Sequence, residues 1–155
     1  MDLIPAPSPN FDQRRAPPDM IVLHYTGMPT GEGALARLRD PEAKVSSHYL
    51  VEEDGRVFSL VAEERRAWHA GVSVLDGVTH VNDFSVGIEM VNRNDGIDPY
   101  PDAQYEAVAG IIRFLRSHYS IPDSRIVSHA AIALPPGRKS DPLGFDFAKL
   151  CALAR

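Results

Sequence analysis

Two histidines and one aspartate are spaced as the ligands of a metal ion could be. His24 directly follows the apolar run 20–23, and His129 follows the short run 125–128. Each run is typical of a buried strand, and α/β proteins place their sites where such strands end. Asp141 comes twelve residues after His129. Two imidazoles and a carboxylate form a common ligand set for catalytic zinc and leave a fourth position for water. The same spacing also fits histidines that end two strands without binding a metal.

A carboxylate and a lysine extend this possible chemistry. Glu89 is the charged residue of the run 86–91, where a buried, unpaired carboxylate would be costly. Beside a metal it could act as a general base, and otherwise it lies at an edge or strand end. Lys139 precedes Asp141 by two residues, and alternate side chains of an extended segment point the same way. Lys139 could therefore stabilise an oxyanion near the metal, although Arg138-Lys139 is also typical of a solvated basic pair.

Three short strands and a hairpin would position these side chains. The strands are expected at 20–23, 86–91 and 125–128. The segment 47–60 predicts an antiparallel hairpin, because two apolar runs flank Asp54-Gly55, a strong signal for a tight turn. A candidate residue therefore lies within or directly after each of the three single strands.

Helices are expected between these strands. Apolar side chains at three-and-four spacing predict a helix over 102–119, with Pro101 at its start. A shorter helix around 34–38 is stopped by Asp40-Pro41, and a terminal helix begins near residue 147. Because strands alternate with helices and the hairpin is antiparallel, we expect an α/β fold with a central mixed β-sheet flanked by helices.

The composition indicates one domain preceded by an arm. Residues 1–19 contain five prolines without periodicity, which is typical of an extended arm on the surface. Residues 20–155 suffice for a single core, since 44% of the chain is hydrophobic. The net charge of -5 argues against a nucleic-acid partner, which would require a basic face. Cys151, the single cysteine, cannot form an intramolecular disulfide and is expected on the terminal helix.

The sequence shows no targeting or anchoring signal. Its first residues lack a basic region with an apolar run, and no Cys near the start could carry a lipid. No stretch approaches the ~18 apolar residues of a membrane span. We therefore expect no membrane anchor and a cytoplasmic protein. A periplasmic location is the alternative if a signal was trimmed from the sequence, and we expect a monomer.

Several segments together resemble a known enzyme family. The chain is similar to the zinc-dependent N-acetylmuramoyl-L-alanine amidases, which share a fold with the peptidoglycan recognition proteins and with phage T7 lysozyme. The resemblance covers residues 20–150 in order and spacing, which makes it more specific than any single motif. The matching segments are IVLHYT at 21–26, VSSHYLV at 45–51, AWHAGVS at 67–73, NDFSVGIE at 82–89, VSHA at 127–130 and RKSDP at 138–142.

This resemblance implies a role for each candidate residue. It implies zinc ligands at His24, His129 and Asp141, a catalytic base at Glu89 and an oxyanion-stabilising cation at Lys139. The chain departs from some relatives at three positions. Asp141 stands where some carry Cys, Ser47 stands where others carry Tyr, and Leu143 is inserted in the loop after Asp141, where it leaves the ligand itself in place.

The resemblance also implies a substrate cleft. Trp68 could stack on a sugar face or simply pack in its loop, and Asn82 could contact the substrate or fix that loop. His69 and Arg138 are expected as further substrate contacts. For the other histidines, His48 is expected to be buried in a structural role, and His80 and His118 are expected at the surface.

The expected activity is therefore zinc-assisted hydrolysis of an amide. The substrate bond would join N-acetylmuramic acid, or its 1,6-anhydro form, to the L-alanine of peptidoglycan fragments, in cell-wall recycling or turnover. The alternative is a peptidoglycan-binding module without catalysis, although such relatives typically lack a complete ligand set. A zinc peptidase that cuts elsewhere in the stem peptide is a second alternative. Recycling of muropeptides in the cytoplasm and remodelling of the wall in the periplasm both remain open.

Overall fold

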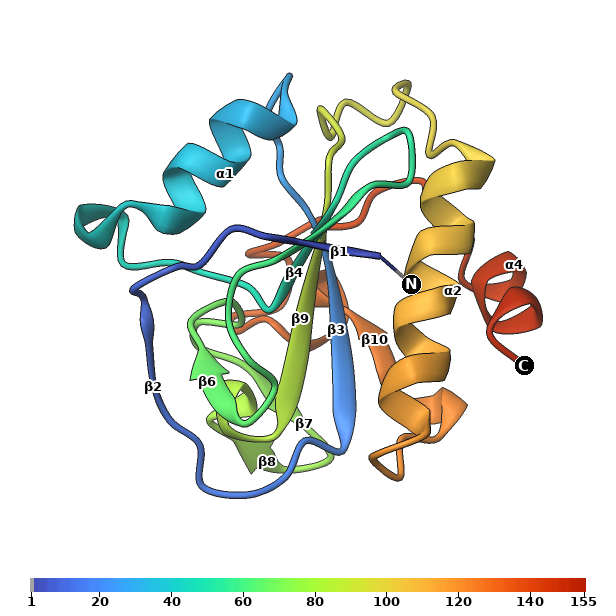
Figure 1. The fold of residues 1–155 in the computed structure, drawn as a ribbon. Helices are drawn as coiled ribbons and strands as arrows, with labels where there is room; N and C mark the ends of the chain where they lie inside the picture. The colour runs from blue at the N-terminus through green and yellow to red at the C-terminus, as the bar shows by residue number, and fades with distance from the viewer. Residues whose placement is uncertain (1) are drawn as a thin grey trace.

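A mixed sheet lies at the centre of the computed structural model, which describes residues 2–155 (Figure 1). In that part of the chain the sheet has six strands in the order β1-β5-β4-β9-β3-β10. The hairpin pair β4–β5 is antiparallel and the other neighbours are parallel, so the predicted mixed sheet is confirmed. The strands are β1 (Leu3–Pro5), β3 (Met20–Tyr25), β4 (Tyr49–Val51), β5 (Val57–Ser59), β9 (Ser85–Met90) and β10 (Ile126–Ser128).

Helices cover both faces of this sheet. α2 (Asp102–Arg116) and α4 (Phe147–Leu153) lie together over one face, and their apolar side chains form the main core with β3 and β9 (Figure 1). α1 (Gly31–Arg39) lies on the other side and packs against Leu50 of β4. Helix α2 ends at Arg116 rather than at the predicted residue 119, because the chain turns at Ser117.

The side chains of β3 and β9 alternate between two environments. Leu23 and Ile88 point into the core beneath α2, where both are fully buried. His24 and Glu89 follow them in sequence and therefore point to the opposite face. These two residues are also paired in register across the two strands. The pleat thus brings a candidate ligand and the candidate base together on the face that α1 partly covers.

The N-terminal segment forms two short strands with exposed side chains, and each pairs with a strand from later in the chain. β1 adds a parallel edge strand beside β5, and β2 (Phe11–Gln13) pairs with β6 (Arg65–Ala67). These strands have only three residues each and mostly exposed side chains, so hydrophobic periodicity gave no sign of them. The side-chain amide of Asn10 anchors the segment by donating to the backbone carbonyls of Asp40 and Val45.

Arg14 joins this N-terminal segment to two loops. Its guanidinium donates to the backbone carbonyls of residues 63, 65, 82, 83 and 85. A planar cation with five N–H groups suits such a cluster of acceptors. Arg14 therefore holds the segments 63–65 and 82–85 together.

Across residues 2–155, no helix is long and apolar enough to cross a membrane.

The remaining elements are short. The elements not yet named are β7 (Val74–Leu75), β8 (Val78–Thr79), α3 (His129–Ile132) and the 3-10 helices Pro41–Ala43, Val81–Asp83 and Asp123–Arg125.

Candidate active site

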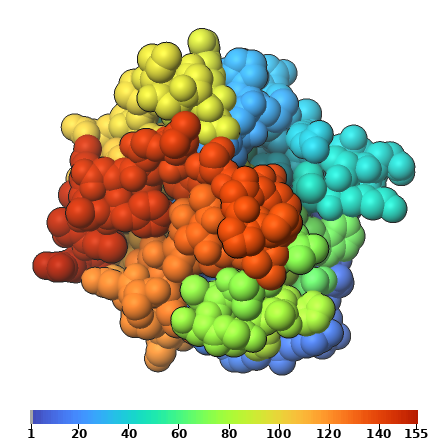
Figure 2. Space-filling view, turned by 180° about the vertical axis from the view of Figure 1, so that it is seen from behind, coloured from blue at the N-terminus to red at the C-terminus, as the bar shows by residue number. Residues whose placement is uncertain are grey.

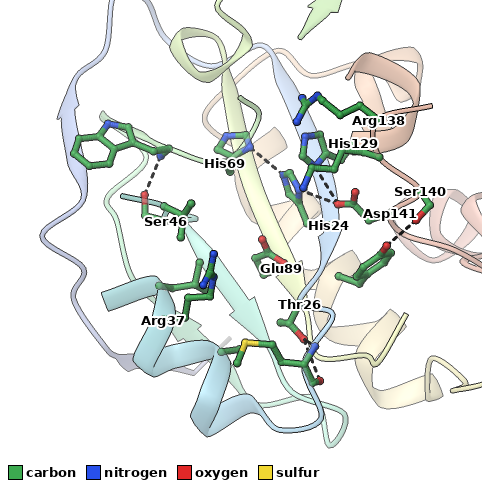
Figure 3. Close-up of a pocket in the computed structure, with 17 residues that line it drawn as sticks. His24, Thr26, Arg37, Ser46, His69, Glu89, His129, Arg138, Ser140 and Asp141 are labelled. Carbon is green, nitrogen blue, oxygen red and sulfur yellow. Dashed lines mark hydrogen bonds and ion pairs between the residues drawn. The ribbon is translucent and has the colours of Figure 1, made fainter. Parts of the chain in front are cut away.

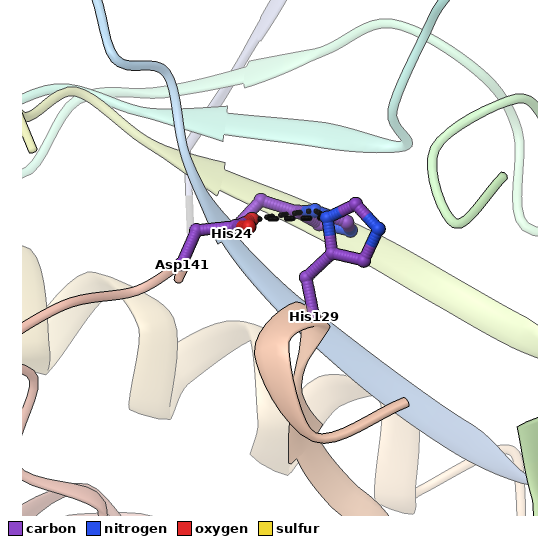
Figure 4. Close-up of side chains that lie close together, drawn as sticks. All are labelled: His24, His129 and Asp141. Atoms are coloured by element: carbon purple, nitrogen blue, oxygen red, sulfur yellow. Dashed lines mark hydrogen bonds and ion pairs between the residues drawn. The ribbon is translucent and has the colours of Figure 1, made fainter. Parts of the chain in front are cut away.

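Three buried side chains converge at the end of strand β3. The ligand atoms of His24, His129 and Asp141 all lie within 4.8 Å of one another (Figure 4). The two Nδ1 atoms are 3.0 Å apart, and Asp141 Oδ2 lies 3.2 Å from Nδ1 of His24 and 3.1 Å from Nδ1 of His129. Ligands at about 2.0 Å from a tetrahedral zinc would lie about 3.3 Å apart. The nitrogen, nitrogen and oxygen donors and their spacing therefore fit such a metal.

Each of the three residues comes from a different element. His24 is the fifth residue of β3, and His129 begins α3 directly after β10. Ser128 caps that short helix by accepting from the N–H of Ala131, which fixes the direction in which His129 leaves the strand. Asp141 lies on a loop, and its carbonyl accepts from the N–H of Ala130. The loop is thus tied to the helix that carries the second histidine.

The protonation states of this cluster suit metal binding. Burial lowers the pKa of His24 to about 4, so its imidazole is neutral at physiological pH. Burial alone would raise the pKa of Asp141, but the neighbouring imidazoles of His129 and His24 hold that pKa below its ordinary value. A neutral imidazole and an ionised carboxylate are the forms that coordinate a metal.

Glu89 is held in an unusual environment beside the cluster. Burial and, to a smaller extent, the charge of Asp141 raise the pKa of its carboxyl to about 8, against the opposing charge of Lys139. Its Oε2 is buried and makes no hydrogen bond with any residue in 2–155. A carboxyl group with a raised pKa and an unused oxygen in a pocket is a candidate for general acid-base chemistry.

These residues line a cavity of about 380 Å³ between the sheet and α1 (Figure 3). Lys139 is exposed at its rim, and its charge acts on both Glu89 and His24. From α1, Arg37 contributes a further cation that sequence reasoning missed, because a helical Arg is normally a surface residue. Figure 2 shows that the segment around 138 meets the segment around 72 on the molecular surface, and Arg138 donates there to the carbonyl of Val72.

The four predicted substrate contacts differ in their burial, in whether they line the cavity and in their hydrogen-bond partners. Trp68 is half-buried and lines the cavity, and so does Arg138, although its guanidinium is bonded to backbone carbonyls. His69 lines the cavity, but its ring nitrogens face His24 and Ser85. Asn82 is buried outside the cavity lining, and its side chain accepts from two backbone N–H groups. Of its two predicted roles, the geometry favours fixing the loop.

The other histidines lie where the sequence predicted. His48 is fully buried, and its Nδ1 accepts from the N–H of Gly87, so it links two strands of the sheet. Burial lowers the pKa of His48 to about 3, which keeps it neutral. His80 and His118 are exposed.

The amino-acid sequence matches a family model described as N-acetylmuramoyl-L-alanine amidase over residues 14–144. It is similar to the 1,6-anhydro-N-acetylmuramyl-L-alanine amidase AmpD of Escherichia coli strain K12. The two are 36% identical, over 95% of this chain and 89% of that protein.

Solved structures give the same result. A crystal structure of a selenomethionine derivative of AmpD superposes with a TM-score of 0.87 and 34% identity, covering 97% of this chain and 93% of that one. The amidase AmiD from Escherichia coli, solved with anhydro-N-acetylmuramic acid-L-Ala-D-γ-Glu-L-Lys, superposes with a TM-score of 0.79 and 35% identity. That match covers 89% of this chain and 58% of AmiD. The family expected from the sequence motifs is confirmed: the chain belongs to the N-acetylmuramoyl-L-alanine amidases, with the mixed-sheet fold of that family.

Proposed function

We propose that this protein is a zinc-dependent amidase that releases the stem peptide from 1,6-anhydro-N-acetylmuramic acid in muropeptides. The observation that carries this proposal is the buried cluster of His24, His129 and Asp141 in a cavity that also holds Glu89. The similarity to AmpD over nearly the whole chain supports the anhydro form of the sugar as substrate.

The zinc ion would be held by His24, His129 and Asp141. When bound, zinc supplies Lewis acidity, which polarises a carbonyl and makes water a stronger acid. The ion is expected to be catalytic rather than structural, because three protein ligands leave a position for reacting groups.

Glu89 carries the proton in this mechanism. Its carboxylate removes a proton from the water that attacks the lactyl carbonyl, and its carboxyl then returns that proton to the L-alanine nitrogen. The unused Oε2 in the cavity supports this role, since a structural carboxylate would have a partner. Breakage of the C–N bond leaves a carboxylate on the sugar and an amine on the peptide.

Lys139 stabilises the charge that develops during this step. Its ammonium group lies at the rim of the cavity, on the same loop as Asp141. A cation at this place favours the tetrahedral oxyanion over the neutral amide. Arg37 lies across the cavity from Asp141 (Figure 3), where a peptide carboxylate would be a suitable partner. Trp68 also lines the cavity and would suit a sugar face.

Mass spectrometry of the products tests the proposal. Anhydromuropeptides should be split into the anhydro sugar and a peptide with a free L-alanine amine, and intact sacculi should be cut far more slowly. A shortened peptide still bonded to the sugar would indicate a peptidase instead. Equal rates on sacculi would contradict the recycling role. The Glu89→Gln protein, purified in parallel, controls for contaminating amidases.

The location of the protein stays a prediction. We expect the protein to be cytoplasmic, because soluble anhydromuropeptides are the proposed substrate. We also expect it to be a monomer. A reporter fusion that is active only in the periplasm would contradict the location, and sedimentation of the purified protein measures the oligomeric state.

A further inference from the structure

Both histidines of the proposed metal site turn their second ring nitrogen toward the same short segment. Nε2 of His129 lies 3.0 Å from the carbonyl oxygen of Ala70. Nε2 of His24 lies 3.0 Å from Nδ1 of His69 (Figure 3). Residues 69 and 70 therefore contact the Nε2 atoms of the two imidazoles, whereas the Nδ1 atoms face Asp141.

The contact with Ala70 settles the tautomer of His129. A carbonyl oxygen can only accept, so His129 must donate the proton on Nε2. A ring with this one proton has its lone pair on Nδ1, the atom that faces Asp141 and His24.

The tautomer of His24 follows from a longer chain of contacts. Oγ of Ser85 lies 2.7 Å from the carbonyl of Val81, so the single hydroxyl proton is donated there. Ser85 must then accept at its other contact, which is Nε2 of His69 at 3.1 Å. Nε2 of His69 therefore carries the proton, and the lone pair of the neutral ring is on Nδ1, which faces Nε2 of His24. His24 therefore donates from Nε2, and its Nδ1 is left with a lone pair.

The surroundings of His69 are built to hold this ring in place. Oδ1 of Asn82 accepts from the backbone N–H groups of both His69 and Ala70, at 3.2 and 2.8 Å. The ring lies against the bare backbone of Gly87, where a Cβ would come within 2.5 Å of Cγ of His69. Glycine inside a strand often marks such a close approach. Both nitrogens of His69 are thus engaged within the protein.

We propose that His69 and Ser85 are positioning residues that hold His24 in the tautomer and orientation that present Nδ1 to the metal. The carbonyl of Ala70 does the same for His129, and Asn82 fixes the segment that supplies both acceptors. This assigns His69 and Asn82 to metal affinity rather than to substrate contact. The inference rests on the proposed zinc site.

The expected effect is on zinc affinity. His69→Leu removes the acceptor and leaves the buried N–H of His24 without a partner, so the dissociation constant for zinc should rise about 10–100-fold. His69→Asn keeps an amide oxygen near the position of Nδ1 and should recover most of the affinity. Ser85→Ala frees His69 to adopt the other tautomer and should weaken binding less than His69→Leu does. His80→Leu, which changes an exposed histidine, is the matched control.

Competition with a chromogenic chelator measures these constants, and kinetics at saturating zinc separate the two roles of His69. A positioning role weakens zinc binding and leaves KM close to normal once zinc is saturating. An unchanged zinc constant with a raised KM in His69→Leu would show a substrate contact and overturn the inference. Wild-type protein that binds no zinc would instead refute the proposed function.

Nitrogen-15 NMR of the imidazoles gives a second readout that needs no variant. His69 should be protonated on Nε2 and not on Nδ1, both in metal-free and in zinc-loaded protein. Protonation of His69 on Nδ1 would reverse the chain of donors and overturn the inference. This measurement and Ser85→Ala decide the matter if His69→Leu fails to fold.

Discussion

The two faces of strands β3 and β9 hold opposite kinds of interaction. Beneath α2, Leu23 and Ile88 are fully buried among other apolar side chains. Such contacts are non-directional and depend mainly on the area removed from water. On the other face, His24 and Glu89 lie in a polar setting. Nε2 of His24 is bonded to His69, and Oε2 of Glu89 has no hydrogen-bond partner within residues 2–155.

Within one strand, the residues of one face therefore contribute to stability, and those of the other face contribute to the chemistry of the site. Ile88 and Glu89 are neighbours in sequence, yet one contributes buried apolar area and the other a raised pKa. A buried carboxyl group without a partner costs stability, and such a cost is commonly retained where it serves function. Changes on one face should therefore alter folding, and changes on the other should alter catalysis.

Removal of the metal should give the largest effect on activity. A strong chelator is expected to abolish amidase activity, while the circular dichroism spectrum and the urea midpoint stay close to those of the untreated protein. The reason is that the core under α2 is large enough to fold without an ion, unlike that of a zinc finger. Full activity without metal would refute the mechanism. Unfolding on chelation would show that the polar face also holds the fold together.

Glu89→Gln should reduce kcat by about 10²–10⁴-fold, the range for loss of a general base, with zinc content unchanged. The variant should not be less stable at neutral pH in metal-free protein. Burial raises the pKa of Glu89 above its unfolded value, so its contribution to stability is present at low pH and is lost as the pH rises toward 8. Urea unfolding at pH 5 and pH 7.5 measures this. A clear loss of stability at pH 7.5 would contradict the comparison of the two faces.

Lys139→Met should lower kcat by about 10²–10³-fold, because one donor to the oxyanion is lost. KM should change less, since binding of the ground state does not use this charge. Lys139→Arg keeps the cation and should retain part of the rate. A near-normal kcat in Lys139→Met would make this residue an ordinary surface charge, and the metal alone would then stabilise the oxyanion.

Ile88→Ala should have the smallest effect on catalysis and a clear effect on folding. Removing a fully buried isoleucine side chain costs about 2–5 kcal/mol, and the milder Ile88→Val costs about 0.5–1.5 kcal/mol. Denaturant unfolding gives these values, and kcat per folded molecule should stay near that of the wild type. A large fall in kcat in the Val variant would show that the two faces are coupled.

Much of the fold could be predicted because its signals are local. Turn residues mark the hairpin around Gly55, and apolar spacing marks the helix α2. Both predictions are confirmed. The N-terminal strands were missed because three-residue pairings with exposed side chains carry no periodicity. Their support comes from residues far along the chain, which no local pattern shows.

The candidate site was predictable in its residue types and less so in their roles. His24, His129 and Glu89 come together because each follows or lies within an apolar strand, and Asp141 joins them from a loop whose backbone is bonded to Ala130. The roles of His69 and Asn82 were not visible in the sequence. They depend on which atom of each side chain meets which partner, and residue spacing carries no information on that. Arg37 was missed for a similar reason, since its place in the cavity depends on how α1 packs.

The contacts of Arg14 have a consequence for the order in which the chain folds. They span 49 to 71 residues, so they cannot form until the loops at 63–65 and 82–85 exist. At about 5–20 residues per second, a ribosome would need about 4–14 s to extend the chain from Arg14 to Ser85. Until Ser85 is made, Arg14 lacks part of its acceptors, and the five prolines of residues 1–19 oppose premature helix formation. This N-terminal segment can therefore be fully fixed only after residues up to Ser85 exist, while α2, β10 and α4 are still to be made.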